Sequence, residues 1–211
     1  MSLQALGPSL LQAVILIVIL LFSLSVHEAA HGAVAYLFGD DTAKRFGRLT
    51  LNPLAHWDRV GTTLLAGLIL LNAFGIAVPV IGWGKPVPVD ESKMDNPRFQ
   101  GLQVALAGPM SNFILAAIIA LIARFIPMPA WLSSALALAV FINLFLMFFN
   151  LLPIPPLDGS RILRLFISDE AYYRLASNPI LFFVIFFVVI YYLAAPLQTL
   201  TSHLAGFLLG G

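Results

Sequence analysis

The sequence contains no cysteine among its 211 residues. This absence excludes disulfide bonds, a catalytic thiol and any metal site that uses cysteine ligands. Charged residues are also scarce, at 10%, and no run of Lys and Arg interleaved with aromatic residues is present. We therefore expect no nucleic-acid partner. A metal site in this chain has to be built from His, Asp or Glu.

Apolar residues dominate what is present. They make up 60% of the chain, and the mean hydropathy is +0.96, which lies outside the range of soluble domains. The first apolar run, residues 10–26, is longer than the core of a signal peptide, and no Lys or Arg precedes it. We therefore expect an integral membrane protein that retains this run as a membrane span.

Long apolar runs predict most of the helices. They lie at residues 10–38, 100–125, 131–149 and 178–209. The last run is interrupted at Pro196, and no repeat or low-complexity segment separates the runs. We expect a single intramembrane domain over residues 1–211, with a core at 10–167 and a C-terminal membrane segment at 178–209.

Two shorter regions differ from these runs. Residues 60–83 are apolar but carry helix breakers at Asn72, Gly75, Pro79 and Gly82, which indicates a segment that enters the membrane and turns back. Residues 48–53 are typical of a short strand and turn, and the prolines at 86 and 88 require an extended path. The expected fold is an all-α polytopic membrane protein with about four to six membrane segments, a re-entrant hairpin and short membrane-associated β segments.

The residues His27-Glu28-Ala29-Ala30-His31 fit the H-E-x-x-H pattern. Residues four apart on a helix lie about 40° apart around its axis, so both imidazoles can reach one ion. Glu28 is of the right type to take a proton from a zinc-bound water. The pattern follows an apolar run, where ionisable side chains are costly and usually mark function. We therefore predict that His27 and His31 bind a metal and that Glu28 is a general base.

A catalytic zinc site needs a third protein ligand and an open position for water. Asp158 follows an apolar run and three prolines, and its alternative role is to cap a short helix that begins there. His56 lies beside Trp57 in the first polar loop, where an interfacial role is the simpler interpretation. His203 lies near the C-terminus without a partner of suitable type. Asp158 is the favoured candidate.

Three motifs follow one another along the chain. The H-E-x-x-H pentapeptide is the first. The second is Gly108-Pro109-Met110-Ser111-Asn112, which matches a G-P-x-x-N element, and the third is residues 150–159, which match N-x-x-P followed by D-G. In this order the three motifs resemble those of the site-2 proteases, a family of intramembrane zinc metalloproteases. The resemblance covers residues 10–165.

The resemblance implies specific roles for these residues. Asp158 becomes the third ligand of one Zn²⁺, and Asn150 becomes a candidate for positioning the substrate or stabilising the oxyanion. For Asn112 a role in helix packing is at least as consistent as a catalytic one. These 211 residues hold no PDZ-like or CBS-like domain, so the sequence resembles a minimal member of the family.

The family implies that the helix bearing the pentapeptide and the helix before the aspartate run parallel. A re-entrant hairpin at 60–83 preserves this arrangement, whereas a full crossing reverses it. With the hairpin, one side of the membrane holds ten basic residues, leaving only Arg124 opposite: Lys44, Arg45, Arg48, Arg59, Lys85, Lys93, Arg98, Arg161, Arg164 and Arg174. A full crossing divides them 5 to 6. The positive-inside rule therefore favours the hairpin and an active site toward the cytoplasmic side of the cell membrane.

The resulting hypothesis is an intramembrane zinc endopeptidase whose partners are the lipid bilayer and a membrane protein or peptide substrate. The competing hypothesis is a metal-ion transporter or a non-catalytic metal-binding membrane protein. A transporter usually carries polar residues along much of the membrane depth, whereas the polar groups here gather at one level. Glu28 would also have no task in a transporter. The sequence leaves the oligomeric state and the substrate open.

Overall fold

A computed structural model describes residues 3–211, without the side chains of 3–8, 179–183, 186, 189 and 190. Over this range the secondary structure is helical. The α-helices are α1 (Leu3–Leu37), α2 (Thr42–Arg45), α3 (Gly61–Ala73), α4 (Pro97–Phe125), α5 (Ala130–Asn150), α6 (Asp169–Ala176) and α7 (Pro179–Leu209). Three 3₁₀-helices are η1 (Pro53–His56), η2 (Glu91–Lys93) and η3 (Asp158–Leu165).

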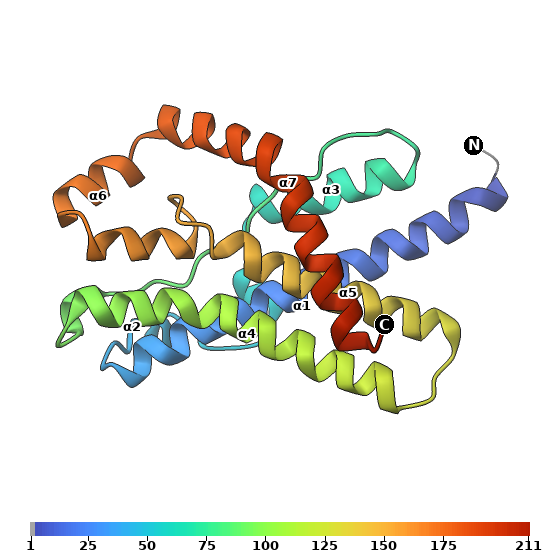
Figure 1. Ribbon diagram of the computed structural model, residues 1–211, viewed down its shortest axis with the longest axis horizontal. Coiled ribbons are helices and arrows are strands. Elements are labelled where there is room, and N and C mark those ends of the chain that lie inside the picture. The colour runs from blue at the N-terminus through green and yellow to red at the C-terminus, as the bar shows by residue number, and fades with distance from the viewer. Residues whose placement is uncertain (1–2) are drawn as a thin grey trace.

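Helices α1, α4 and α5 form the centre of the molecule. Helix α4 packs against both of the others, and α1 and α5 run in the same direction while α4 runs opposite to them (Figure 1). Small side chains allow this close packing: Ala116 and Ala120 of α4 are buried against Val140 and Leu144 of α5. The parallel course of α1 and α5 is the arrangement expected from the sequence.

Three helices among those with described side chains are long and apolar enough to cross a membrane: Ser9–Leu37 within α1, α4 and α5. Helix α3 is apolar but has only 13 residues, a length of about 20 Å, whereas a hydrocarbon core is about 30 Å thick. Helix α3 is therefore too short to cross alone. Helix α7 continues through Pro196, where an interruption was expected.

Residues 60–83 form a hairpin with one helical arm and one irregular arm. Helix α3 ends at a turn in which Gly75 has a φ of 84°, a left-handed conformation that favours glycine. The Asn72 side chain then donates hydrogen bonds of 2.9 Å to the carbonyls of Leu68 and Val78. The turn lies at Asn72 and Gly75, two of the four helix breakers that indicated a re-entrant segment.

The returning arm ends beside the beginning of α3. The hydroxyl of Thr62 donates to the Trp83 carbonyl at 3.1 Å, and the Lys85 amide donates to the His56 carbonyl at 2.9 Å. The two ends of the hairpin therefore lie at the same level, so α4 begins at the end of the molecule where α1 finishes (Figure 1).

The short β segments expected from the sequence are absent from residues 3–211. Residues 49 and 50 form bends, Pro53 already belongs to η1, and residues 76–90 are irregular. Pro86 and Pro88 have no amide hydrogen to donate to a strand. The Arg48 side chain, which is buried, instead donates to the carbonyls of Lys85 and Pro86. The Arg48 guanidinium therefore occupies main-chain carbonyls that would accept hydrogen bonds from a neighbouring strand in a β-sheet.

Candidate metal site

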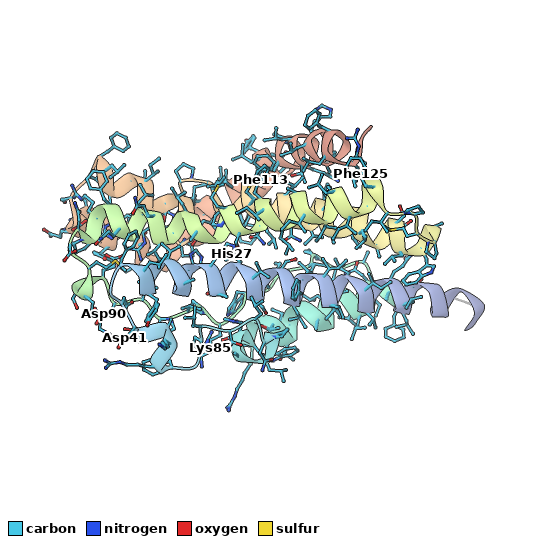
Figure 2. The ribbon with its side chains drawn as sticks, turned by 90° about the horizontal axis from the view of Figure 1, so that it is seen from below. His27, Asp41, Lys85, Asp90, Phe113 and Phe125 are labelled. Carbon is cyan, nitrogen blue, oxygen red and sulfur yellow. The ribbon has the colours of Figure 1, made fainter. Side chains whose placement is uncertain are left out.

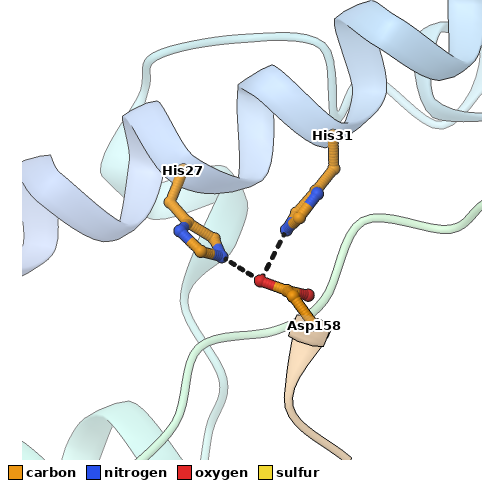
Figure 3. A group of neighbouring side chains, drawn as sticks. All are labelled: His27, His31 and Asp158. Atoms are coloured by element: carbon orange, nitrogen blue, oxygen red, sulfur yellow. Dashed lines mark ion pairs between the residues drawn. The ribbon is translucent and has the colours of Figure 1, made fainter. Parts of the chain in front are cut away.

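His27 and His31 lie on successive turns of α1 and point toward the same carboxylate (Figure 3). His27 Nε2 stands 3.0 Å and His31 Nε2 3.4 Å from Asp158 Oδ2. Their rings meet edge to face with centroids 4.6 Å apart. Both histidines are buried, and the three ligand atoms all lie within 4.8 Å of one another. In the part of the chain with described side chains, this is the only such group that could hold a metal ion.

The donor set fits a zinc ion. In a tetrahedral site with bonds of about 2.0 Å, neighbouring ligand atoms are separated by about 3.3 Å, close to both distances from Asp158 Oδ2. This oxygen is buried and accepts no hydrogen bond in the structure, and an unpaired buried carboxylate oxygen is costly. Two nitrogens and one oxygen leave a fourth position for water.

Asp158 reaches the histidines from the start of η3. The N-cap of η3 is Leu157, and no side chain caps this helix. Asp158 is instead the first residue of η3, so the capping role considered for it is not the one it adopts. The segment before it turns through residues 151–157 and returns toward α1. This turn brings Asp158 close to His31 although the two residues are 127 positions apart in the sequence.

The other ring nitrogen of each histidine is held from α4. His31 Nδ1 lies 2.7 Å from the Val104 carbonyl, and His27 Nδ1 lies 2.6 Å from Asn112 Oδ1. A carbonyl can only accept, so Nδ1 of His31 carries the hydrogen and Nε2 is left free to bind a metal. No sequence pattern pointed to Val104, because its contribution is a main-chain atom.

Gly108 brings α4 against both histidines. A Cβ at this position would stand 2.5 Å from His27 Nε2 and 2.5 Å from His31 Nε2. Any side chain here would therefore occupy the space where the imidazole nitrogens face Asp158. The absence of a side chain at the glycine of the G-P-x-x-N element thus allows α4 to pack directly against the two imidazoles.

Glu28 lies one position along α1 from His27 and faces the irregular segment after α3. Its Oε2 accepts a hydrogen bond of 2.7 Å from the Val87 amide. Pro86 and Pro88 flank Val87 and have no main-chain N–H. The Val87 N–H is therefore the only main-chain hydrogen-bond donor among these three residues. The carboxylate therefore has one oxygen engaged by the main chain.

The remaining candidates from the sequence lie elsewhere. Asn150 Nδ2 donates to the Leu146 carbonyl of its own helix at 2.9 Å. His56 Nε2 lies 2.8 Å from the Thr50 carbonyl, and His203 is exposed. The group formed by His27, His31 and Asp158 includes none of these three.

An ion-pair cluster that the sequence analysis did not identify holds η3 in place. Glu91 of η2 pairs with Arg161 and with Arg164, the latter at 2.7 Å. Arg164 is only 3% exposed and also reaches Asp169 at 3.0 Å. Burial alone would lower the pKa of Arg164, but the hydrogen bonds to Asp169 and Glu91 outweigh it and raise the pKa. The sequence does not indicate which oppositely charged residues pair when they lie far apart in the chain. These ion pairs could therefore be recognised only in the tertiary structure.

The chain is similar to a known peptidase family and to several of its members. The model of Peptidase family M50 matches residues 15–132 and 126–193. The chain is 40% identical over 183 residues to a Bacillus subtilis protein with the provisional name zinc metalloprotease YwhC, covering 82% of this chain and 78% of that protein.

More distant relatives carry related names. One is Rip2 of Mycobacterium tuberculosis, provisionally named a zinc metalloprotease, which is 33% identical over 84% of this chain and 66% of its own length. Zinc metalloprotease MJ0392 of Methanocaldococcus jannaschii is 26% identical over 78% of this chain and 39% of its own length. No solved structure matches the chain significantly. The resemblance drawn from the three motifs is confirmed: the chain belongs to Peptidase family M50, the site-2 protease family.

Proposed function

We propose that the protein is a zinc endopeptidase that hydrolyses peptide bonds in or near the transmembrane segments of membrane proteins. The observation that carries the proposal is the convergence of His27, His31 and Asp158 within 4.8 Å, with Glu28 next to the first histidine. The metalloprotease names of the relatives support the reaction class. The apolar length of α1, which bears the motif, supports a site at membrane depth.

His27, His31 and Asp158 would hold the metal. A bound zinc ion supplies Lewis acidity and lowers the pKa of water to about 7, which makes hydrolysis possible at neutral pH. Glu28 accepts the proton of the attacking water and delivers it to the leaving amine. Its hydrogen bond to the Val87 amide orients the carboxylate for this transfer.

A helical substrate has to unwind before attack, because its carbonyls are hydrogen-bonded within the helix. Asn150 is proposed to position the exposed carbonyl or to stabilise the oxyanion. For this role its amide would leave the Leu146 carbonyl, which it contacts at 2.9 Å. This exchange is possible because the hydrogen bond lies within α5 and the Asn150 side chain is only half-buried.

We further propose that the site faces the cytoplasmic side of the cell membrane. Figure 2 shows Asp41 and Asp90 at one end of the molecule and Phe125 at the opposite end. The salt bridges of Lys93 with Asp41 and of Arg164 with Glu91 belong to the first end, whereas Arg124 is adjacent to Phe125. This distribution of basic residues supports the positive-inside orientation and a re-entrant course for residues 60–83.

A metal-ion transporter is the competing function. It would also place His and carboxylate ligands in a membrane helix, but it would not need a carboxylate that is held beside the ligands by a main-chain amide. Glu28→Gln separates the two functions. The glutamine amide cannot act as a base, whereas the three proposed metal ligands are unchanged.

The test is co-expression of the wild type or Glu28→Gln with a panel of single-span membrane proteins, read by mass spectrometry for new termini. We expect cleavage within or beside a span with the wild type alone, and equal zinc content in both purified proteins. Addition of a chelator should stop cleavage, and zinc should restore it. Intact cleavage by Glu28→Gln, or zinc uptake by cells without cleavage, would overturn the proposal.

A further inference from the structure

Three polar side chains lie fully buried between α1, α4 and α5. Asn112 of α4 and Asn143 of α5 are 0% exposed, and Ser23 of α1 is 1% exposed. An amide in a membrane interior is costly unless its donors and acceptor are all engaged. Here the three side chains bond to one another and to the main chain, so their orientations depend on each other.

The orientation of Asn143 is set by a main-chain carbonyl. Its Nδ2 lies 2.9 Å from the Ala139 carbonyl and 2.9 Å from Ser23 Oγ. A carbonyl can only accept, so the NH₂ group of Asn143 must face Ala139. Its oxygen consequently points toward Asn112 of the neighbouring helix.

The orientation of Asn112 follows from that of Asn143. Asn112 Nδ2 donates to Asn143 Oδ1 at 2.9 Å and to the Ser23 carbonyl at 3.3 Å. Both of its donors are thereby used, and Oδ1 is the atom left to face His27 Nδ1 at 2.6 Å. Nδ1 of His27 must therefore carry the hydrogen, and Nε2 presents its lone pair toward Asp158.

We propose that Asn143 is a positioning residue for the metal site, acting through Asn112 on the tautomer and ring orientation of His27. The inference rests on the proposed zinc site. The relay runs from the Ala139 carbonyl through Asn143 and Asn112 to His27, and it crosses from α5 to α4 to α1. His31 needs no such relay, because the Val104 carbonyl holds it directly.

Replacement of Asn143 by Leu removes the nearer of the two acceptors that orient Asn112 and leaves the Ser23 carbonyl at 3.3 Å as the other. The Asn112 amide can then turn its NH₂ group toward His27, which favours the tautomer with the hydrogen on Nε2, the nitrogen needed for the metal. Loss of a partner behind a metal ligand typically costs about tenfold to a hundredfold in metal affinity. We expect a loss of this size for Asn143→Leu, measured by competition with a chromogenic chelator on the purified protein in detergent.

A second background distinguishes the relay from simple packing. In Asn112→Asp both carboxylate oxygens accept, so His27 has an acceptor whichever way residue 112 turns. Asn143→Leu should therefore weaken zinc binding in the wild type and not in the Asn112→Asp background. An equal loss in both backgrounds, or a loss in neither, would overturn the relay.

A matched control is Asn72→Leu, because Asn72 also donates to the carbonyl four residues before it but lies exposed on α3. Its zinc affinity should equal that of the wild type. A wild type that binds no zinc would instead overturn the proposed function.

Discussion

The Val87 amide donates a hydrogen bond of 2.7 Å to Glu28 Oε2, joining the irregular segment after α3 to the carboxylate beside the proposed metal ligands. This segment is itself anchored, since Arg48 donates to the carbonyls of Lys85 and Pro86. The position of Glu28 is therefore set by two regions, α1 and the segment that follows the hairpin. A general base has to be placed precisely to move a proton.

Shortening Glu28 by one methylene tests this placement. Glu28→Asp keeps the charge but cannot reach the Val87 amide and the water position together. We expect kcat/KM for a cleaved single-span substrate to fall about a hundredfold, with zinc affinity unchanged. Wild-type activity in Glu28→Asp would show that the contact with Val87 does not position the base.

Gly108→Ala should weaken zinc binding strongly. The added Cβ would stand 2.5 Å from His27 Nε2 and from His31 Nε2, so the rings or α4 must move. We expect zinc affinity to fall by about a hundredfold or more, measured by metal analysis after dialysis against a chelator. Gly67→Ala is the matched control, because nothing lies within 4 Å of a Cβ there and alanine favours a helix. Zinc retained by Gly108→Ala would contradict the close approach.

Glu91→Gln should destabilise the segment that carries Asp158. The change leaves Arg164, at 3% exposure, with Asp169 but without its carboxylate partner on η2, and removing one partner of a buried ion pair is strongly destabilising. We expect the free energy of unfolding in mixed micelles to fall by about 3 kcal/mol, together with zinc affinity. The control is Glu170→Gln, whose partner Arg174 is exposed and whose loss should cost less than about 1 kcal/mol. Equal stabilities for the two variants would exclude a role for the cluster.

The buried carboxylate of Asp40, just beyond α1, should make stability depend on pH. Burial alone would raise its pKa, but hydrogen bonds from Thr42, the Asp90 amide and Lys93 outweigh it and lower the pKa below 3.8. The folded state therefore binds fewer protons than the unfolded state between the two pKa values. The contribution of Asp40 is present above the unfolded value and is lost as pH falls through the folded one.

Asp40→Asn measures this contribution. The difference in free energy of unfolding between the wild type and Asp40→Asn should shrink as pH falls from about 5 to about 3. Denaturation in micelles at several pH values gives the difference directly. A difference that is constant over this range would show that Asp40 keeps the same protonation state in the folded and unfolded protein.

Local spacing was sufficient to predict some features. The four-residue separation of His27 and His31 depends only on helix geometry, and Gly75 marks a turn because few other residues adopt its backbone conformation. The expected strand at 48–53 did not form, because pairing depends on a partner that the local sequence does not specify. Asn143 could have been noticed as an amide inside an apolar run, but its partners could not.

The sequence by itself determined that this is a membrane protein of the site-2 protease family with a candidate metal-binding pair on one helix, since composition and short motifs are local properties. Only the tertiary structure decided that Asp158 turns toward this pair, that Asn112 contacts His27, and that Val87 engages Glu28. Each of these contacts joins residues at least 59 positions apart. Such contacts depend on how the helices pack and where the main chain between them turns, which no local pattern encodes.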